Sequence, residues 1–120
     1  MRMVNNHKDL EVWKQSIDFV TAIYNITKEF PKEEIYGLTS QIRRASVSIP
    51  SNIAEGAARK NKTEFRQFLY ISLGSLSEVE TQLIISLEIS YLEKKAFEEL
   101  NFKLISIRKM LIGLIKSLKV

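Results

Sequence analysis

Cysteine is absent from the 120-residue chain, and glycine and proline are scarce, with four and two residues respectively. Without cysteine the chain cannot form a disulfide, supply a thiolate nucleophile or build a cysteine-ligated metal site. So few helix-breaking residues in a chain of this length favour long helices. The length predicts one domain over residues 1–120, large enough to bury roughly two-thirds of the surface that the unfolded chain exposes.

Long hydrophobic runs are also missing. No apolar segment reaches the roughly 18 to 20 residues that cross a bilayer, and the opening MRMVNNHKDL lacks the apolar core of a signal peptide. With no disulfides to form, these features predict a cytoplasmic protein without a membrane partner. The composition, 45% hydrophobic and 27% charged, is that of a folded chain and not of a disordered one.

Residues with catalytic chemistry are few. The one histidine, His7, lies in a polar N-terminal segment, where a solvated or frayed side chain is a better reading than a ligand or base. Neither Glu-x-x-His nor His-Glu-x-x-His occurs, although such motifs supply the usual metal ligands of bundles. On a helix Glu78 and Glu80 would point about 200° apart, so they are no carboxylate pair. One of them could accept hydrogen bonds from a neighbouring helix, and a solvated acid is an equal alternative. We expect no enzyme activity, catalytic residue, metal or cofactor.

Apolar residues recur at three- and four-residue spacing along most of the chain, and no stretch alternates with period two. The spacing predicts four helices, at about 9–29, 33–60, 62–90 and 94–118. Pro31 ends the first, because the residue before a proline is pushed out of the α region. Asn61 and Glu64 resemble a capping box at the start of the third. Short links imply antiparallel neighbours, so the predicted fold is all-α, an antiparallel up-down-up-down four-helix bundle.

Charge is unevenly distributed along the chain, although the net value of +4 is modest. Residues 41–66 hold six basic and two acidic side chains, and residues 101–120 hold five basic and no acidic ones, which leaves −5 for the remainder. A subunit polarised in this way suits a polyanion partner, a complementary copy of itself, or both. Solvated helix faces are the simpler reading for any single charge.

A polar strip on the second predicted helix is the candidate nucleic-acid surface. Arg44, Ser48, Ser51, Glu55 and Arg59 follow one another at steps of three or four residues, so they share one helix face. Arginines and serines there could bind phosphates with an affinity that falls steeply with salt. No base-reading module or aromatic platform accompanies them, and a solvated face with a Glu55–Arg59 pair is an equal competitor. The predicted nucleic-acid-binding residues are Arg43, Arg44, Arg59, Lys60, Lys62 and Arg66.

The stretch SVSIPSNIAEGAARK, residues 46–60, interrupts the helical pattern with a proline and a glycine. Pro50 removes one backbone donor, at a cost of order 3 kcal/mol in an isolated helix. We predict a kinked helix here and not a loop. The bend is predicted to present Asn52, Glu55 and Gly56 to another helix or to a neighbouring subunit.

Small residues inside a helix favour self-assembly. Gly74, Ser75 and Ser77 lie within the third predicted helix, where a glycine costs about 1 kcal/mol relative to alanine. A small surface in mid-helix usually lets another helix approach closely, and the apolar arc of the first helix is wider than one packing side needs. These features predict a homo-oligomer. A monomer with a well-filled core is the alternative.

Three segments carry a family resemblance: LEVWKQSIDFV, YGLTSQIRRASVSIPSNIAEGAAR and FLYISLGSLSEVETQL. They resemble the four-helix-bundle family named for 23S ribosomal RNA intervening sequences, over residues 10–92, and SIPSNIAEG is the most specific part. The last predicted helix matches in pattern only. The residues that match the family pattern are Gly37, Gln41, Arg43, Arg44, Pro50, Asn52, Glu55 and Gly56.

The resemblance implies a small all-helical protein that assembles into a ring-like homopentamer of four-helix bundles. Some members are encoded within insertions of the large ribosomal RNA gene. A related bundle, the accessory variability determinant of diversity-generating retroelements, is also pentameric and works with a reverse transcriptase and nucleic acid. The family's own biochemical role is not established.

Residues and resemblance together predict a non-catalytic oligomeric adaptor. Its basic surfaces are expected to bind ribosomal or other structured RNA, or DNA. The alternative is a homo-oligomeric protein–protein scaffold without affinity for nucleic acid, whose basic faces contact its own acidic zone.

Overall fold

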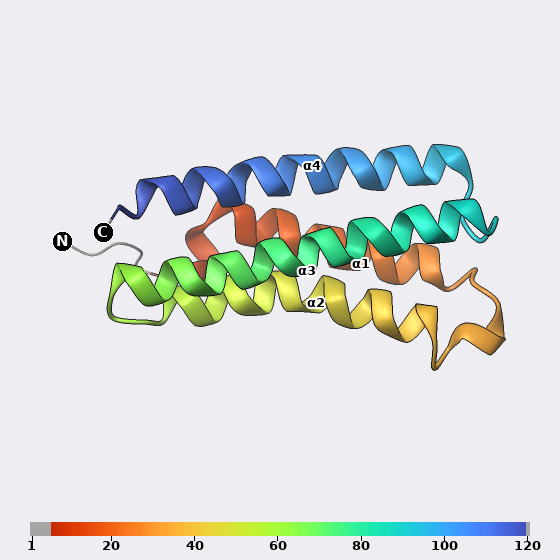
Figure 1. Cartoon of the computed structure of the whole chain (residues 1–120), viewed down its shortest axis with the longest axis horizontal. Coiled ribbons are helices and arrows are strands. Elements are labelled where there is room, and N and C mark those ends of the chain that lie inside the picture. Colours follow the sequence, from red (N-terminus) through yellow and green to blue (C-terminus); the bar gives the residue numbers. More distant parts are fainter. Residues whose placement is uncertain (1–5, 120) are drawn as a thin grey trace.

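Four long helices make up most of the computed structural model, which describes residues 6–119. The helices are α1 (Glu11–Thr27), α2 (Leu38–Ala57), α3 (Lys62–Glu88) and α4 (Lys94–Ser117), and 3-10 turns cover His7–Asp9 and Lys32–Glu34. They lie side by side along the long axis of a body that measures 49 × 24 × 20 Å (Figure 1). The described residues contain no strand, so the prediction of an all-α fold with four helices is confirmed.

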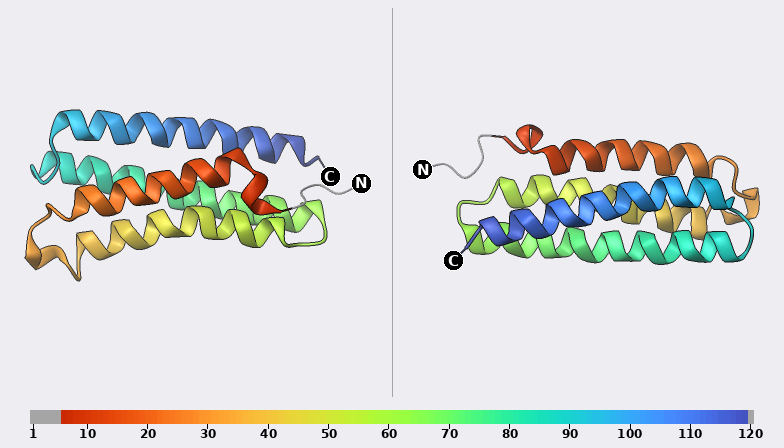
Figure 2. Two further views of the ribbon diagram at one scale, coloured as in Figure 1. Left: turned by 180° about the vertical axis from the view of Figure 1, so that it is seen from behind. Right: turned by 90° about the horizontal axis from the view of Figure 1, so that it is seen from above.

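Each helix packs against its neighbours in the sequence, and α4 also packs against α1. The α1–α2 and α3–α4 connections lie at one end of the molecule (Figures 1 and 2). The α2–α3 connection lies at the other end, together with the start of α1 and the end of α4. Within residues 6–119, the backbones of α1 and α3, and those of α2 and α4, do not approach closely, and the buried side chains of all four helices form one core.

Aliphatic and phenylalanine side chains from all four helices fill this core. Their three- and four-residue spacing places them on one face of each helix, as the sequence pattern indicates. Burial of each such side chain contributes roughly 1.5–3 kcal/mol, so the core is the main source of stability. The largest fully buried side chains are Phe19, Phe65, Ile23, Ile42, Ile49, Ile53, Leu69, Leu76, Leu83, Leu104, Ile107 and Leu111.

The second helix begins later than the predicted residue 33. Lys32–Glu34 forms a separate 3-10 turn, and α2 starts at Leu38. The reason is a cap, because Glu34 Oε1 accepts a hydrogen bond at 3.0 Å from the Leu38 backbone N–H, a donor without a partner inside the helix. Gly37 leaves room for this carboxylate, since a Cβ there would lie 2.7 Å from Glu34 Oε1. Glu34 therefore lies near the positive end of the α2 dipole, but it precedes the helix and is not part of its first turn.

The other helix ends lie within three residues of their predicted positions. At the start of α3, Asn61 Oδ1 accepts a hydrogen bond at 2.9 Å from the Glu64 N–H, and Asn61 Nδ2 donates to Glu64 Oε2 at 2.9 Å. The cap predicted at Asn61 is therefore confirmed. Because the Asn61 side chain replaces an intrahelical partner for Glu64, the helix begins sharply after the short α2–α3 connection.

A Schellman motif ends α3. The Tyr91 N–H donates to the Ser86 carbonyl at 2.9 Å and the Ser90 N–H to the Leu87 carbonyl at 3.1 Å. Ser90 has a φ of 66°, the left-handed conformation that this motif requires and that glycine usually supplies. The turn directs Tyr91 toward the α1–α2 connection, where its Oη donates to Glu34 Oε2 at 2.9 Å.

Candidate nucleic-acid interface

Two of the six predicted nucleic-acid-binding residues are engaged inside the bundle, and Arg43 is the first. Its Nε donates to Thr27 Oγ1 at 2.9 Å and its Nη2 to the Tyr24 carbonyl at 3.4 Å. The guanidinium also lies over the Tyr24 ring, 4.7 Å from the centroid. Arg43 thus ties α2 to the last turn of α1, where a cation meets the negative end of the helix dipole.

Arg66 is the second engaged arginine. Its Nη1 donates to the Ile115 carbonyl at 2.6 Å and to the Leu118 carbonyl at 3.2 Å. The final carbonyls of a helix have no partner within it, so Arg66 of α3 satisfies the C-terminal end of α4. The half-buried guanidinium holds two helices together, which leaves less of it for a phosphate.

The other four residues lie toward solvent. Arg44 is on the outer side of α2, Arg59 and Lys60 lie in the α2–α3 connection, and Lys62 begins α3. Arg59 Nη2 forms the expected pair with Glu55 Oε2 at 3.6 Å, and its guanidinium lies 4.7 Å from the centroid of the Phe68 ring. An exposed pair of this kind contributes about 0–1 kcal/mol, so Arg59 stays accessible to another anion.

Arg44 lines a polar hollow of about 430 Å³ between α2 and α3. A hydrogen bond of 2.8 Å between Ser48 Oγ and Ser75 Oγ joins the two helices at the hollow. One acid, Glu78, also lines it, and neither Arg44 nor Glu78 forms an ion pair with any residue from 6 to 119. The hollow therefore combines hydroxyl groups with one cation and one anion that are in no ion pair with the described residues, although Glu78 accepts a long hydrogen bond of 3.4 Å from Gln82 Nε2.

The proline stretch is helical, as predicted, as far as Ala57, and its last three residues lie in the α2–α3 connection. Residues 38–57 form one continuous helix through Pro50, whose buried ring lies in an apolar groove beside Trp13 and Ile17 of α1. Asn52 Nδ2 donates to the Ser48 carbonyl at 2.8 Å and to Ser48 Oγ at 2.9 Å. These bonds supply polar support beside the donor that proline removes. A functional role for a bend at Pro50 stays a prediction.

Gly56 lies where α2 and α3 approach closely. A Cβ at this position would lie 2.8 Å from Phe68 Cβ and 2.9 Å from Phe65 Cδ1. The sequence offered two partners for Gly56, another helix or a neighbouring subunit, and the structure shows a helix of the same chain. Glu55, one residue earlier, points outward and is exposed.

Gly74 and Gly113 have no comparable explanation inside the chain. A Cβ at either position would meet no atom within 4 Å, although both lie in the interior of long helices, α3 and α4. A glycine in such a position costs about 1 kcal/mol relative to alanine. Packing within one copy therefore gives no reason for either residue.

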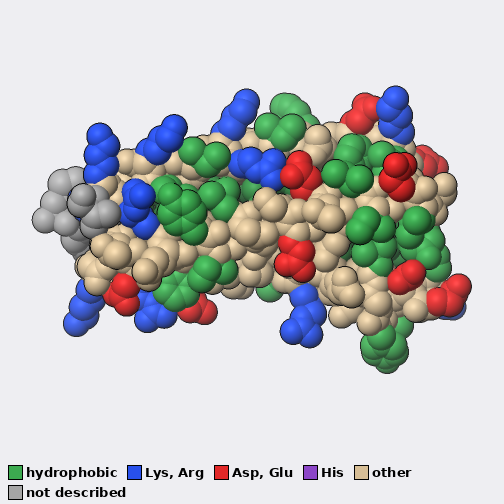
Figure 3. Space-filling model, viewed as in Figure 1, with side chains coloured by type: hydrophobic (Ala, Val, Ile, Leu, Met, Phe, Trp, Pro, Cys, Tyr) green, Lys and Arg blue, Asp and Glu red, His purple; other side chains and the backbone are tan. Residues whose placement is uncertain are grey.

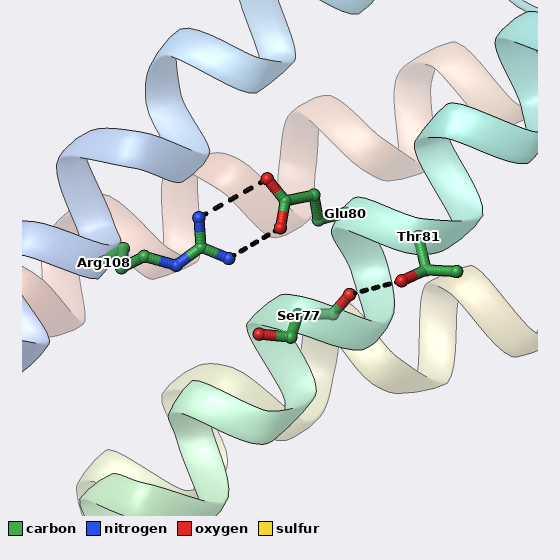
Figure 4. Close-up of polar contacts among 4 residues, drawn as sticks. All are labelled: Ser77, Glu80, Thr81 and Arg108. Carbon is green, nitrogen blue, oxygen red and sulfur yellow. Dashed lines mark hydrogen bonds and ion pairs between the residues drawn. The ribbon is translucent and has the colours of Figure 1, made fainter.

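Arg108 forms an ion pair with Glu80, so its charge is neutralised and does not add to the basic surface. The guanidinium of Arg108 on α4 donates to both carboxylate oxygens of Glu80 on α3, at 2.9 and 3.4 Å (Figure 4). Figure 4 also shows Thr81 Oγ1 donating to the Ser77 carbonyl, at 2.9 Å. The expectation that one of the two glutamates faces a neighbouring helix is met by Glu80. The two-pronged contact fixes the register of α3 against α4.

The two ends of the bundle differ in charge. On the side seen in Figure 3, Lys and Arg side chains predominate toward the end that holds the α2–α3 connection, and Asp and Glu toward the other. At the acidic end the Leu38 N–H and then the Tyr91 hydroxyl stabilise the Glu34 carboxylate, which lowers the pKa of Glu34. The same hydrogen bond to Glu34 raises the pKa of Tyr91. A polyanion would be drawn to the opposite, basic end.

The described residues contain neither a cluster of metal ligands nor a helix suited to span a membrane. Between residues 6 and 119, no three His, Asp or Glu side chains gather closely enough to hold a metal ion. His7 is half-buried and packs edge-on against Trp13, with the ring centroids 5.1 Å apart, and so is less solvated than expected. None of the four helices combines the length and apolar character that a bilayer span requires.

Sequence reasoning missed the intramolecular roles of Arg43 and Arg66. A single sequence shows that both are basic, but not that the carbonyls at the end of another helix lie beside them. The one available signal is indirect: each arginine lies in a helix that a four-helix arrangement places next to a helix C-terminus. The polar hollow at Arg44 also depends on a pairing of α2 with α3 that helical spacing alone does not give.

The fold and this surface define a small helical bundle with a basic end. A family model for the 23S rRNA-intervening sequence protein matches residues 8–113, and the chain belongs to that family, as the resemblance indicated. The chain is also similar to a crystal structure of a protein of unknown function from the S23 ribosomal protein family of Bacteroides thetaiotaomicron. Identity is 27% over 88% of this chain and 98% of that chain, with a TM-score of 0.79. No curated protein matches.

Proposed function

We propose that the protein is a non-catalytic, oligomeric adaptor that binds structured RNA, or DNA, through the basic end of an antiparallel bundle. The observation that supports this function most is the exposed strip of Arg59, Lys60 and Lys62 in the α2–α3 connection and at the start of α3. Phosphate contacts from such side chains provide affinity without sequence readout. The strip holds no base-stacking platform, which fits recognition of a folded nucleic acid by shape and charge.

The strip is tested by removal of charge from its lysines. We expect Lys60→Gln with Lys62→Gln to weaken binding of a structured RNA and to lower the salt dependence of log affinity by about one to two units, because two phosphate contacts are lost. Fluorescence anisotropy across a salt series from about 50 to 200 mM measures both quantities. The matched control is Lys94→Gln with Lys95→Gln, which removes the same charge from two exposed lysines at the acidic end.

Two results would count against the nucleic-acid role. One is wild-type protein that binds neither RNA nor DNA at about 50 mM salt, where electrostatic affinity is strong. The other is an equal loss of affinity in the two double variants. Binding would then depend on the net charge of the protein and not on the position of the lysines.

Assembly into a ring-like homo-oligomer belongs to the same proposal, and the family resemblance favours five subunits of the 13.9 kDa chain. The exposed apolar residues of α3 are the structural observation that supports self-association. If the ring forms but nucleic acid does not bind, the protein is a protein–protein scaffold. Light scattering measures the assembled mass, and a monomer at tens of micromolar would contradict the oligomer.

A further inference from the structure

The side of α3 that faces away from the core is apolar without being covered. Its large hydrophobic residues are each between 43% and 54% exposed, whereas the opposite side of the helix is fully buried. Figure 3 views the molecule from this side and shows hydrophobic side chains gathered toward both ends of α3. A helix that is apolar on two sides is typical of one that packs on two sides. The α3 outer face comprises Tyr70, Ile71, Gly74, Glu78, Thr81, Ile84, Ile85 and Ile89.

Gly74 lies on the α3 outer face, near the middle of α3. Gly56 is explained by the Phe65 and Phe68 atoms that crowd it, but a Cβ at Gly74 would meet nothing within 4 Å. The residue at this point therefore leaves the α3 backbone open to approach from outside the chain. Close approach of a second helix is the usual structural reason for such a glycine.

Charge at the edge of this face identifies the partner. The polar hollow beside Gly74 holds Arg44 and Glu78, neither of them in an ion pair with any described residue. A polyanion would be attracted by Arg44 and repelled by Glu78, so the hollow is poorly matched to nucleic acid. A surface that carries both charges suits a ring of copies of this chain, in which Arg44 of each copy meets Glu78 of the next and Glu78 meets Arg44 of the previous one.

We propose that the α3 outer face is the surface on which a second copy of this chain docks, with Arg44 pairing with the partner's Glu78. Gly74 allows the incoming backbone to approach, the exposed isoleucines and Tyr70 bury apolar area, and the charged pair sets the register. The inference rests on the proposed self-assembly and names its interface. It is separate from the lysine strip at the basic end.

A glycine pair provides the first test. Gly74→Gln adds a side chain where the partner would approach, and we expect the dissociation constant of the assembly to rise at least tenfold. Gly113→Gln is the matched control, because that glycine is also in a helix interior with nothing within 4 Å, but lies on α4. Sedimentation velocity over a dilution series measures the change. Helical circular dichroism should be unchanged or increased in both variants.

A charge swap provides the second test. Arg44→Glu and Glu78→Arg should each weaken assembly, because each places like charges opposite one another. The double variant restores a pair of opposite charge in reversed order, so its dissociation constant should return toward the wild-type value. Neither residue pairs within the described chain, so the folded bundle should tolerate all three variants.

Three outcomes would overturn the interface. They are a monomeric wild type, an equal loss of assembly in the two glutamine variants, and a double charge variant no better assembled than the single ones. The second and third leave an oligomer that uses another surface. RNA binding measured on the same samples decides the nucleic-acid role independently, because Lys60 and Lys62 lie outside the α3 outer face.

Discussion

At the scale of single residues, short polar contacts determine where the helices begin and which charges stay free. Glu34 caps α2, Arg43 and Arg66 satisfy the ends of α1 and α4, and Glu80 holds Arg108. The sequence allows a contact between Glu80 and a neighbouring helix, but it does not show that Arg43 and Arg66 are engaged within the bundle. What remains exposed and unpaired, above all Arg44, is therefore more informative than the number of basic residues.

Glu34 gives a prediction of pH dependence. Its pKa is lowered from the ordinary 4.5, first by the hydrogen bond from the Leu38 N–H and then by that from Tyr91. The unfolded chain thus binds the proton more readily, so this contribution is fully present above about pH 4.5 and is lost as pH falls through the folded value. We expect Glu34→Gln to lose less stability than wild type on acidification, as measured by urea unfolding between about pH 7 and pH 3.

Glu33→Gln is the appropriate control for this experiment. Glu33 is exposed, lies in the same 3-10 turn and carries the same charge, but makes no hydrogen bond comparable to that of Glu34. An identical pH profile for wild type and Glu34→Gln would show that the cap does not act through the charged carboxylate.

At the scale of the elements, helix ends are set by backbone conformation as much as by side chains. Ser90 adopts a φ of 66° to close the Schellman motif after α3, a conformation that disfavours any residue with a Cβ. We expect Ser90→Gly to raise the free energy of unfolding by about 0.5 to 1 kcal/mol. Thermal or urea unfolding measures the gain. Ser117→Gly, at an exposed site without positive φ, should give none.

The sequence was sufficient to predict the four helices, because their apolar residues follow one period over long stretches. It misplaced the start of α2, since the pair Glu33 and Glu34 suits the helix dipole equally well inside the first turn or just ahead of it. The candidate site was only partly predictable. Four of the six basic residues are exposed as expected, but the engagement of Arg43 and Arg66 depends on which helix end packs beside each of them.

At the scale of the whole molecule, the proposed binding surfaces differ in physical character. The basic strip acts by charge, whereas the α3 outer face buries mainly apolar area. Raising salt from about 50 to 200 mM should therefore weaken RNA binding by orders of magnitude but change self-assembly only slightly. Anisotropy and sedimentation on the same sample compare the two. Parallel salt sensitivity would show that assembly is instead driven by the opposite charges of the two ends.

The close contact of α2 with α3 also has a kinetic consequence. Among the described residues, α2 and α3 contact each other more extensively than any other pair of helices. Their connection is short, they approach closely at Gly56, and two hydrogen bonds join them: Ser72 Oγ to the Ile49 carbonyl, and Ser48 Oγ with Ser75 Oγ. Contacts so close in sequence form at little loop-closure cost, so this hairpin has the features of an early folding nucleus. Newly synthesised chains would then display the α3 outer face once α3 has been made, before α4 has docked.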